Sequence, residues 1–407
     1  MKLNAAKSML LLTVILMDLL AGTEFDLFVP SFPELHDHFH LTPAWVEALL
    51  SVNFIGYCLS LFFVGSLADR YGRKPIILIG LVTFIVGSML CLWGISYNIV
   101  LIGRFLQGLG IAAPAILSFL IIADAYPLKK QQFYMAMLNG VMNTSVAIAP
   151  VIGSYITLYF HWRGNFIALL FLALITLAMT MLYIPTYKQP EHKESISFSG
   201  YIPLFQSKPL MLLMANIIFM FVPYWIFVGM SPLLYMKDLG VSLSHFGYYQ
   251  GVLALVFALG SVLFGLIMHR YEQKKMLYVS SKIYIVSLIV IASITFINSM
   301  NPLIITLAFL PFIISQIIPS NMLVPLCLNF IPHAKGRVSA ILQGSRLIFA
   351  SLSLQVAGYF YTGSFRNIGI IVSGFIVMVI ITQFFVIKNR DLMNMNKTDK
   401  MVTGNDD

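Results

Sequence analysis

The sequence is poor in charge. Of its 407 residues, 10% are Asp, Glu, Lys or Arg, against 59% that are hydrophobic, and the mean hydropathy is +0.88. Soluble domains carry about 25% charged residues, so this composition excludes an ordinary soluble fold. The net charge of +9 does not indicate a nucleic-acid partner, because the basic residues are scattered at the ends of apolar runs. We expect a polytopic membrane protein embedded in a lipid bilayer.

Cysteine is also scarce. Cys58, Cys91 and Cys327 lie inside apolar runs without CxxC or metal-ligand spacing, and we interpret them as buried apolar side chains. The segment 36–40 contains three histidines and an aspartate but no fourth fixed ligand, so we expect a solvated loop and no metal site. The chain lacks a phosphate-binding P-loop and a hydrolase nucleophile motif, so it predicts neither ATP-driven transport nor an enzyme.

Apolar runs long enough to cross a bilayer recur along the chain. A transmembrane helix needs about 20 mostly apolar residues. The first run resembles a signal peptide, but its apolar character continues to Pro30, so we interpret it as an uncleaved span. The predicted fold is an all-α membrane protein of twelve transmembrane helices, at residues 8–30, 44–66, 75–96, 99–123, 133–158, 164–185, 211–235, 245–269, 276–297, 302–328, 338–361 and 366–388.

The longest polar connection divides these spans into six and six. We therefore predict an N-terminal six-helix bundle at 1–187, a cytoplasmic linker at 188–208, a C-terminal six-helix bundle at 209–390 and a disordered cytoplasmic tail at 391–407.

The loops on alternate sides of these spans differ in basic residues. With the N-terminus in the cytoplasm, the outer loops hold only Arg163, Lys237 and Arg366 of the 25 Lys and Arg residues. Since Lys and Arg are concentrated in cytoplasmic loops, both termini are predicted to be cytoplasmic.

The densest charge in the chain lies between the second and third predicted spans. Each of these groups would cost a few kcal/mol or more in hydrocarbon, so the segment is predicted to turn at the membrane surface. Its glycines allow tight turning, and Pro75 suits the first turn of the next helix. The residues concerned are Gly65, Asp69, Arg70, Gly72, Arg73 and Lys74.

Residues 265–275 repeat part of this pattern at a spacing of 200, with His269 in place of Asp69. A repeat of two six-span halves indicates a secondary transporter with its substrate cavity between them near the midplane.

Three motifs resemble those of the major facilitator superfamily, specifically its twelve-span drug:proton antiporters of the Bcr/CflA and MdfA kind. Residues 65–74 match the superfamily's loop motif, and residues 104–113 are similar to its fourth-span motif. Gly140, Pro150 and Gly153 resemble its fifth-span antiporter motif, although Ala149 and Ser154 stand where the family has glycine. The resemblance implies two pseudo-symmetric six-helix bundles in a bacterial inner membrane.

The first span contains three acidic residues. Ionisable groups inside a span are costly and are functional candidates by default. Asp18 lies roughly 15 Å from the cytoplasmic end, near the midplane, and Asp26 lies near the outer surface. Eight residues apart, they can share one side of a helix, whereas Glu24 points elsewhere from Asp26. For each acid the alternative is structural: a carboxylate satisfied by polar neighbours at Asp18, and an interfacial acid wetted from outside at Asp26 and Glu24.

MdfA-like antiporters have an acidic pair at the spacing of Asp18 and Asp26. The resemblance therefore implies that these two residues carry proton coupling and that Arg104 modulates proton release. An Arg at the depth of Arg104 needs an acidic or carbonyl partner, and the acids of the first span match its depth. The alternative for Arg104 is an ion pair that only packs helices.

The predicted substrate cavity contains Asp18, Tyr224, Trp225 and Arg346. Aromatic side chains can stack on drugs or bind cations, although they are also ordinary membrane packing and interface residues. Arg346 can either snorkel to the cytoplasmic surface or line the cavity, where it would favour an anionic or zwitterionic substrate.

These observations favour a proton-coupled exporter of small amphipathic molecules, working by alternating access. It would need no cofactor beyond the proton gradient, bind protons and a small-molecule substrate, and function as a monomer. The alternatives are an exporter of an endogenous anionic metabolite such as a carboxylate siderophore, and a membrane receptor that does not transport. The resemblance also implies that Asp69 latches the cytoplasmic side by engaging the backbone near residues 336–339.

Overall fold

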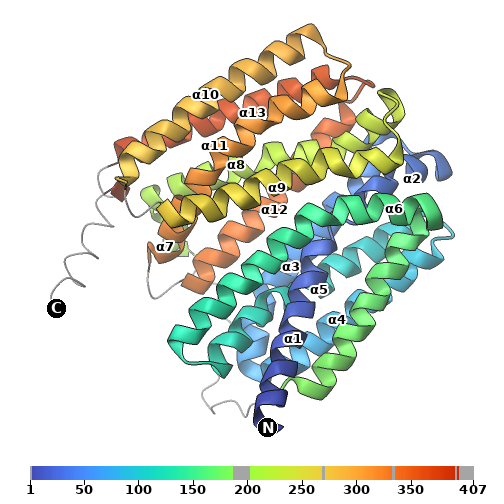
Figure 1. Ribbon diagram of the computed structural model, residues 1–407, viewed down its shortest axis with the longest axis vertical. Helices are drawn as coiled ribbons and strands as arrows, with labels where there is room; N and C mark the ends of the chain where they lie inside the picture. Colours follow the sequence, from blue (N-terminus) through green and yellow to red (C-terminus); the bar gives the residue numbers. More distant parts are fainter. Residues whose placement is uncertain (1, 187–201, 268–270, 332–334, 390–391, 394–407) are drawn as a thin grey trace. The chain divides into compact units, whose positions relative to one another are not determined.

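The computed structural model describes residues 2–186, 202–267, 271–331, 335–389 and 392–393 (Figure 1). Within these residues the secondary structure is helical, with no strand. The elements are α1 (Lys2–Thr23), η1 (Val29–Ser31), α2 (Phe32–His38), α3 (Pro43–Tyr71), α4 (Arg73–Trp93), α5 (Tyr97–Ala125), α6 (Leu128–Tyr183), α7 (Ile202–Gln206), α8 (Lys208–Pro232), η3 (Leu233–Asp238), α9 (Leu243–Ile267), α10 (Gln273–Ile297), α11 (Pro302–Asn329), α12 (Lys335–Tyr359) and α13 (Phe365–Lys388).

Ten helices in the described ranges are long and apolar enough to cross a membrane. One of them lies in α6, whose 56 residues would extend roughly 80 Å, far more than the 30 Å of a hydrocarbon core. His161 interrupts α6 with φ 59° and ψ −176°, so α6 consists of two helices that correspond to the fifth and sixth predicted spans. The first predicted span overlaps α1, which ends at Thr23.

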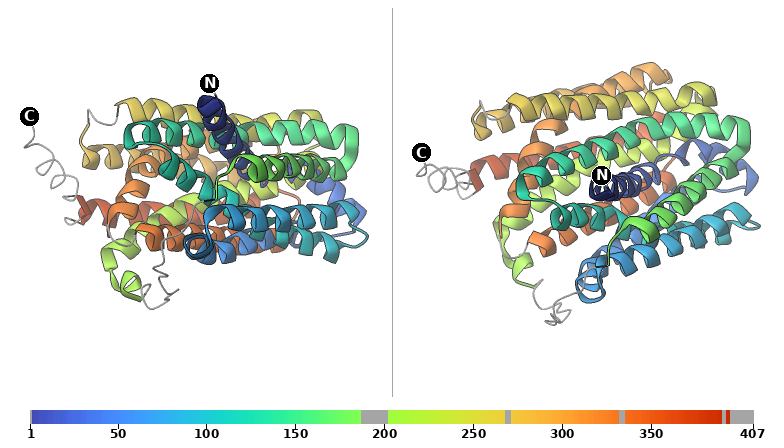
Figure 2. Two further views of the ribbon diagram at one scale, coloured as in Figure 1. Left: turned by 90° about the horizontal axis from the view of Figure 1, so that it is seen from below. Right: turned by 60° about the horizontal axis from the view of Figure 1, so that its bottom comes forward.

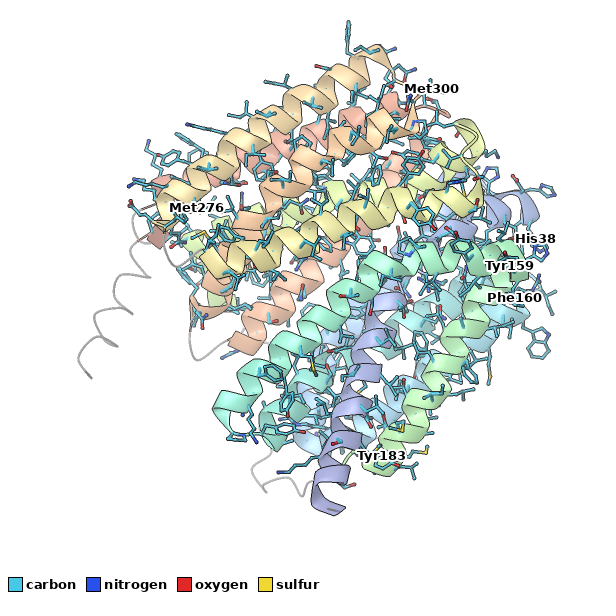
Figure 3. The ribbon with its side chains drawn as sticks, in the orientation of Figure 1. His38, Tyr159, Phe160, Tyr183, Met276 and Met300 are labelled. Carbon is cyan, nitrogen blue, oxygen red and sulfur yellow. The ribbon has the colours of Figure 1, made fainter. Side chains whose placement is uncertain are left out.

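Aromatic side chains mark both ends of the second helix of α6. Tyr159 and Phe160 immediately precede the break at His161, where this helix begins, and Tyr183 lies at its end. Figure 3 labels them near its opposite ends. The distance between them along the helix is roughly 35 Å, slightly more than the 30 Å of a bilayer core. All three side chains are exposed. This arrangement fits aromatic residues at the two membrane interfaces.

The chain divides into two compact units. The first comprises Met1–Ile196, Trp225–Leu255 and Gln343–Ser364. The second comprises Ser197–Tyr224, Val256–Leu342 and Phe365–Asp407. The predicted linker and tail fall mostly outside the described residues, as does His269 of the second motif copy, so the sequence-based domain boundaries stay a prediction.

Glycines bring three helices of the first unit into backbone contact. A Cβ on Gly80 of α4 would lie 2.7 Å from the carbonyl oxygen of Gly110 of α5, and one on Gly87 would lie 2.6 Å from that of Gly103. On another face of α5, Gly108 abuts the backbone carbonyl of Asn53 in α3. Figure 2 shows these helices of the first unit packed side by side. In lipid, where apolar surface supplies little drive for association, such close packing is what holds helices together.

The second unit is joined by polar contacts between helices. Ser280 of α10 donates to the carbonyl oxygen of Ser315 in α11 at 2.9 Å, and Gln383 of α13 donates to that of Leu277 at 3.0 Å. Asn216 of α8 donates to the hydroxyl of Thr382 at 2.9 Å. Each bond satisfies a buried polar group in a helix that faces lipid elsewhere.

The predicted turn between the second and third spans is confirmed at Gly72, whereas Gly65 and the other residues up to Tyr71 are helical in α3. α3 ends at Tyr71, Gly72 takes φ 93°, and α4 begins at Arg73. Only glycine adopts such a backbone at little cost. Arg73 forms an ion pair with Asp124 at 2.6 Å, and the guanidinium of Arg70 lies 5.3 Å from the ring centre of Tyr71. The side chain of Asp69 is outside the described part of the chain, so its role as a latch stays a prediction.

Two glycines of the fifth-span motif differ in their surroundings, and this difference predicts their tolerance of substitution. A Cβ on Gly153 would overlap the carbonyl oxygen of Leu27, whereas one on Gly140 would meet no described atom within 4 Å. We expect Gly153→Ala to destabilise the protein by about 1–3 kcal/mol through overpacking. Gly140→Ala, the matched control, should be neutral or stabilise the helix by up to about 1 kcal/mol. The thermal unfolding midpoint in detergent measures both, and equal midpoints for the two variants would contradict the close approach.

Candidate functional site

The helix of the first predicted span ends before the last two of its three acidic residues. α1 stops at Thr23, whose hydroxyl donates to the carbonyl oxygen of Leu19 at 2.8 Å, and the chain then turns before η1. Asp18 is therefore helical, but Glu24 and Asp26 are not. The prediction of one continuous helix through Asp26 is therefore wrong, and the placement of Asp18 and Asp26 on one side stays a prediction.

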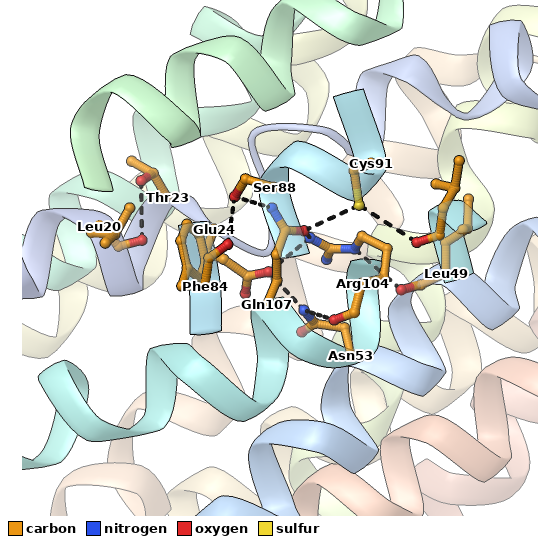
Figure 4. Close-up of polar contacts among 11 residues, drawn as sticks. Leu20, Thr23, Glu24, Leu49, Asn53, Phe84, Ser88, Cys91, Arg104 and Gln107 are labelled. Atoms are coloured by element: carbon orange, nitrogen blue, oxygen red, sulfur yellow. Dashed lines mark hydrogen bonds and ion pairs between the residues drawn. The ribbon is translucent and has the colours of Figure 1, made fainter. Parts of the chain in front are cut away.

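A buried ion pair joins this turn to α5. Arg104 Nη1 lies 2.7 Å from Glu24 Oε1, and both side chains are fully buried (Figure 4). The expectation that Arg104 has an acidic partner in the first span is confirmed. The partner is Glu24, and the interpretation of Glu24 as a wetted interfacial acid is wrong because no part of it reaches solvent.

Polar groups from three helices surround the pair. Asn53 of α3 donates to Glu24 Oε1 at 2.7 Å and to the carbonyl oxygen of Arg104 at 3.0 Å. Arg104 also donates from Nη1 to Gln107 Oε1 at 2.7 Å, and Gln107 Nε2 donates to the hydroxyl of Ser88 in α4 at 2.8 Å. These bonds offset part of the cost of burying two charges.

The guanidinium has two further contacts. Arg104 Nε donates to the carbonyl oxygen of Leu49 at 3.3 Å. Its Cζ lies 4.1 Å from the centre of the Phe28 ring, at the distance of a cation–π contact. Arg104 is thus held by a carboxylate, an amide, a carbonyl and an aromatic face.

The other two acids of this region have fewer partners. Asp18 is buried and accepts one hydrogen bond at Oδ1, from Ser118 of α5 at 2.8 Å. Asp26 is also buried, and neither of its carboxyl oxygens has a hydrogen-bond partner among the described residues. The alternative of an outer acid wetted by solvent is therefore wrong for Asp26. The assignment of proton coupling to Asp18 and Asp26 stays a prediction.

The residues predicted to line the cavity lie in different surroundings. Trp225 of α8 is buried, and its ring lies 4.8 Å from that of Phe54 and 5.9 Å from that of Phe25. Tyr224 is half-buried and belongs to the second unit. Arg346 is half-buried, and its Nη1 donates to Gln343 Oε1 at 2.9 Å. A shared cavity for these residues stays a prediction.

Residues 36–38 of the segment with three histidines are helical and end α2, so the expectation of a loop is wrong for them. His36 and Asp37 form an ion-pair cluster with Lys237 at this end of α2. Lys237 of η3 lies 3.3 Å from Asp37 Oδ1, and His36 Nδ1 lies 2.9 Å from the same oxygen. Partial burial opposes ionisation, but the hydrogen bonds from His36 and Lys237 and the charge of Lys237 hold the pKa of Asp37 below its usual value. No group of three potential metal ligands occurs among the described residues.

Sequence reasoning missed Glu47. It is a fully buried carboxyl in α3, and neither oxygen has a hydrogen-bond partner in the ranges that the structure describes. The signal was available, because Glu47 lies inside the predicted span 44–66 between Val46 and Ala48. It is the only acidic residue in that span.

Comparison with known proteins assigns the fold to a class of membrane transporters. A model of the Major Facilitator Superfamily matches residues 14–354. The chain belongs to this superfamily, so its family resemblance is confirmed.

Among relatives, the chain is 26% identical over 277 residues to a protein named multidrug resistance protein MdtL from Shewanella oneidensis, covering 67% of this chain and 69% of that protein. It is 28% identical over 267 residues to a bicyclomycin resistance protein homologue from Haemophilus influenzae, covering 63% and 66%. An Escherichia coli MdtL is 29% identical over 244 residues, covering 58% and 60%. The chain thus spans about two thirds or less of the length of these relatives.

Solved structures with the same fold include two membrane transporters. A D-xylose–proton symporter superposes with a TM-score of 0.71 at 14% identity, over 93% of this chain and 96% of that chain. A bacterial homologue of the human lysosomal transporter Spinster superposes with a TM-score of 0.74 at 16% identity, over 94% and 97%. At these identities the likeness shows the major facilitator fold and nothing about substrate.

The buried ion pair of Glu24 and Arg104 predicts that a single variant loses more stability than the double variant. Removing one partner leaves an uncompensated buried charge, so we expect Arg104→Gln to destabilise the protein by about 3–5 kcal/mol. The double variant Glu24→Gln with Arg104→Gln should recover part of this loss, because no charge then remains unpaired. Asp37→Asn breaks an exposed pair and should cost at most about 1 kcal/mol.

Unfolding midpoints of the purified proteins in detergent measure these effects. If the double variant were as unstable as the sum of the two single variants, the direct coupling of Glu24 to Arg104 would be disproved.

Proposed function

We propose that this chain is a proton-coupled exporter of small amphipathic, drug-like molecules. It works by alternating access as a monomer in a bacterial inner membrane, with both termini in the cytoplasm. The names of the relatives, which refer to multidrug and bicyclomycin resistance, support a drug-like substrate. The excess of Lys and Arg in alternate loops supports the orientation.

The observation that carries this proposal is the unequal pairing of the acids in and after α1. Glu24 has a fixed counter-charge in Arg104 at 2.7 Å, whereas Asp18 has one neutral hydrogen-bond donor and Asp26 has none among the described residues. A buried carboxylate without a counter-charge is costly. Asp18 and Asp26 are therefore the acids that exchange protons, and Glu24 and Arg104 keep the site in place.

Asp18 couples the proton flux to the substrate flux, because the proton and the substrate compete for its carboxyl. A proton and a cationic or polar substrate are alternative ways to compensate its buried charge, so the arrival of one favours release of the other. Ser118 holds the carboxyl from α5 through Oδ1, and Oδ2 has no partner in the described part of the chain. This free oxygen is the atom that accepts the proton.

The proposal predicts the behaviour of Asp18→Asn. The amide keeps the size of the side chain but cannot exchange a proton, so we expect proton-driven efflux of a lipophilic cation such as ethidium to fall by about tenfold or more, which corresponds to at least about 1.4 kcal/mol. The measurement is substrate accumulation in energised everted membrane vesicles, with substrate-induced proton release recorded in parallel.

Asp18→Glu is the matched control, because it keeps a carboxyl and should retain part of the coupling. Asp37→Asn, at an exposed position of α2, should transport like the wild type. Undiminished coupled transport by a well-expressed Asp18→Asn protein would remove Asp18 from the mechanism.

A further inference from the structure

Glu47 occupies a space formed by two glycines on other helices. A Cβ on Gly229 of α8 would overlap Glu47 Oε2, and a Cβ on Gly358 of α12 would lie 3.2 Å from Glu47 Cγ. Leu354 of α12 closes the same space, since its Cδ2 also meets the Gly229 position. Any other residue at 229 would displace the carboxyl, so the helices approach each other around this side chain. All of these residues belong to the first unit.

The contact continues inward along α3 and α12. Ser51 and Ser351 exchange hydrogen bonds, each hydroxyl donating to the other's carbonyl oxygen, at 3.1 and 3.2 Å. Gln355 Nε2 donates to the hydroxyl of Ser51 at 3.0 Å. We call this pairing of residues 47–51 of α3 with residues 351–358 of α12 the α3–α12 seam. Its serines and Gln355 are satisfied, whereas Glu47 is not.

An isolated carboxylate does not fit this position. Both Glu47 oxygens are buried and lack hydrogen-bond partners among the described residues, and the glycines and Leu354 around them carry no polar side chain. Burying an unpaired charge costs several kcal/mol or more, far above the cost of burying a neutral acid. The packing of the seam is therefore compatible with a protonated Glu47.

A recess lies one helical turn away from Glu47. This recess of about 190 Å³ is lined by Pro43 at the start of α3, by Lys237 and Asp238 of η3, and by Tyr361 beyond α12. Pro43 and Glu47 are about 6 Å apart along the helix. An ionised Glu47 would need contact with water. The helices of the seam would have to separate toward this recess to provide it.

Several charged and titratable groups on the neighbouring elements have other partners. Lys237, His36 and Asp37 form one ion-pair cluster, and Tyr361 donates to Asp238. Arg104 pairs with Glu24, the Tyr97 hydroxyl donates to the carbonyl oxygen of Trp45, and Arg346 donates to Gln343. The described contacts thus give Glu47 no counter-charge.

We propose that Glu47 is a second proton-binding site of this transporter, and that its protonated form permits the α3–α12 seam to close. Loss of this proton to water opens the seam. The inference rests on the proposed exporter function for its place in the transport cycle, and it adds a proton site distinct from the acids in and after α1.

The sign of the pH dependence comes from this linkage. The closed seam holds a proton that the open seam releases, so closure is favoured at low pH and lost as pH rises. At pH values where Glu47 is ionised in the open seam but protonated in the closed seam, the ratio of open to closed molecules rises by up to about tenfold per pH unit.

The test measures the width of the seam directly. Trp45 and Tyr359, 54% and 77% exposed at the ends of α3 and α12, accept spin labels as cysteine variants once Cys58, Cys91 and Cys327 are replaced by alanine. Distance distributions from about pH 5 to about pH 9 should show a growing open population when Glu47 is present. The seam should stay closed across this range in both Glu47→Gln and Glu47→Leu. The leucine variant serves as a second test because, unlike a buried glutamine amide, its side chain needs no hydrogen-bond partner.

Glu272→Gln is the matched control, because it removes an exposed carboxyl on the second unit and should keep the pH response. A pH response that persists in Glu47→Gln or Glu47→Leu overturns the proposal, as does its absence when Glu47 is present. The exporter function is tested separately in vesicles: if the wild type moves no substrate there but the seam still responds through Glu47, the function fails and the proton site stands.

Discussion

The structure of the first unit depends on one buried ion pair in a protein with little charge. Burying Glu24 and Arg104 costs several kcal/mol per ion, and their attraction offsets this only with good geometry and further hydrogen bonds. The bonds come from Asn53 of α3 and from Gln107 and Ser88 of α5 and α4. The pair therefore fixes how the turn after α1 meets three helices.

Close helix packing makes this polar network possible. Gly103 and Gly108 of α5 lie against α4 and α3, with no room for a side chain at either position. Bringing the backbones together places the short side chains of Asn53 and Ser88 within hydrogen-bond distance of the network around Arg104. Small residues thus allow van der Waals contact between the helices and also bring the polar groups close enough to form hydrogen bonds. Helix association in lipid relies on both.

Four buried carboxyls in the first unit have three kinds of surroundings. Glu24 has a counter-charge, Asp18 has one hydroxyl donor, and Asp26 and Glu47 have no hydrogen-bond partner among the described residues. Because desolvation penalises only the charged form, this difference divides the acids by role. The paired acid maintains the architecture, and the other three are the acids that we propose exchange protons.

The sequence by itself determined the spans, the turn at Gly72, the need of Arg104 for a partner and the superfamily, because desolvation of charge and backbone restriction act locally. Only the tertiary structure decided that the partner is Glu24, since α1 ends at Thr23 and helical periodicity no longer orients the residues after it. The tertiary structure also determined the surroundings of Glu47, because Gly229 and Gly358, which lie against it, are far from it in the sequence. Which groups meet a buried carboxyl depends on helix packing, which no local pattern encodes.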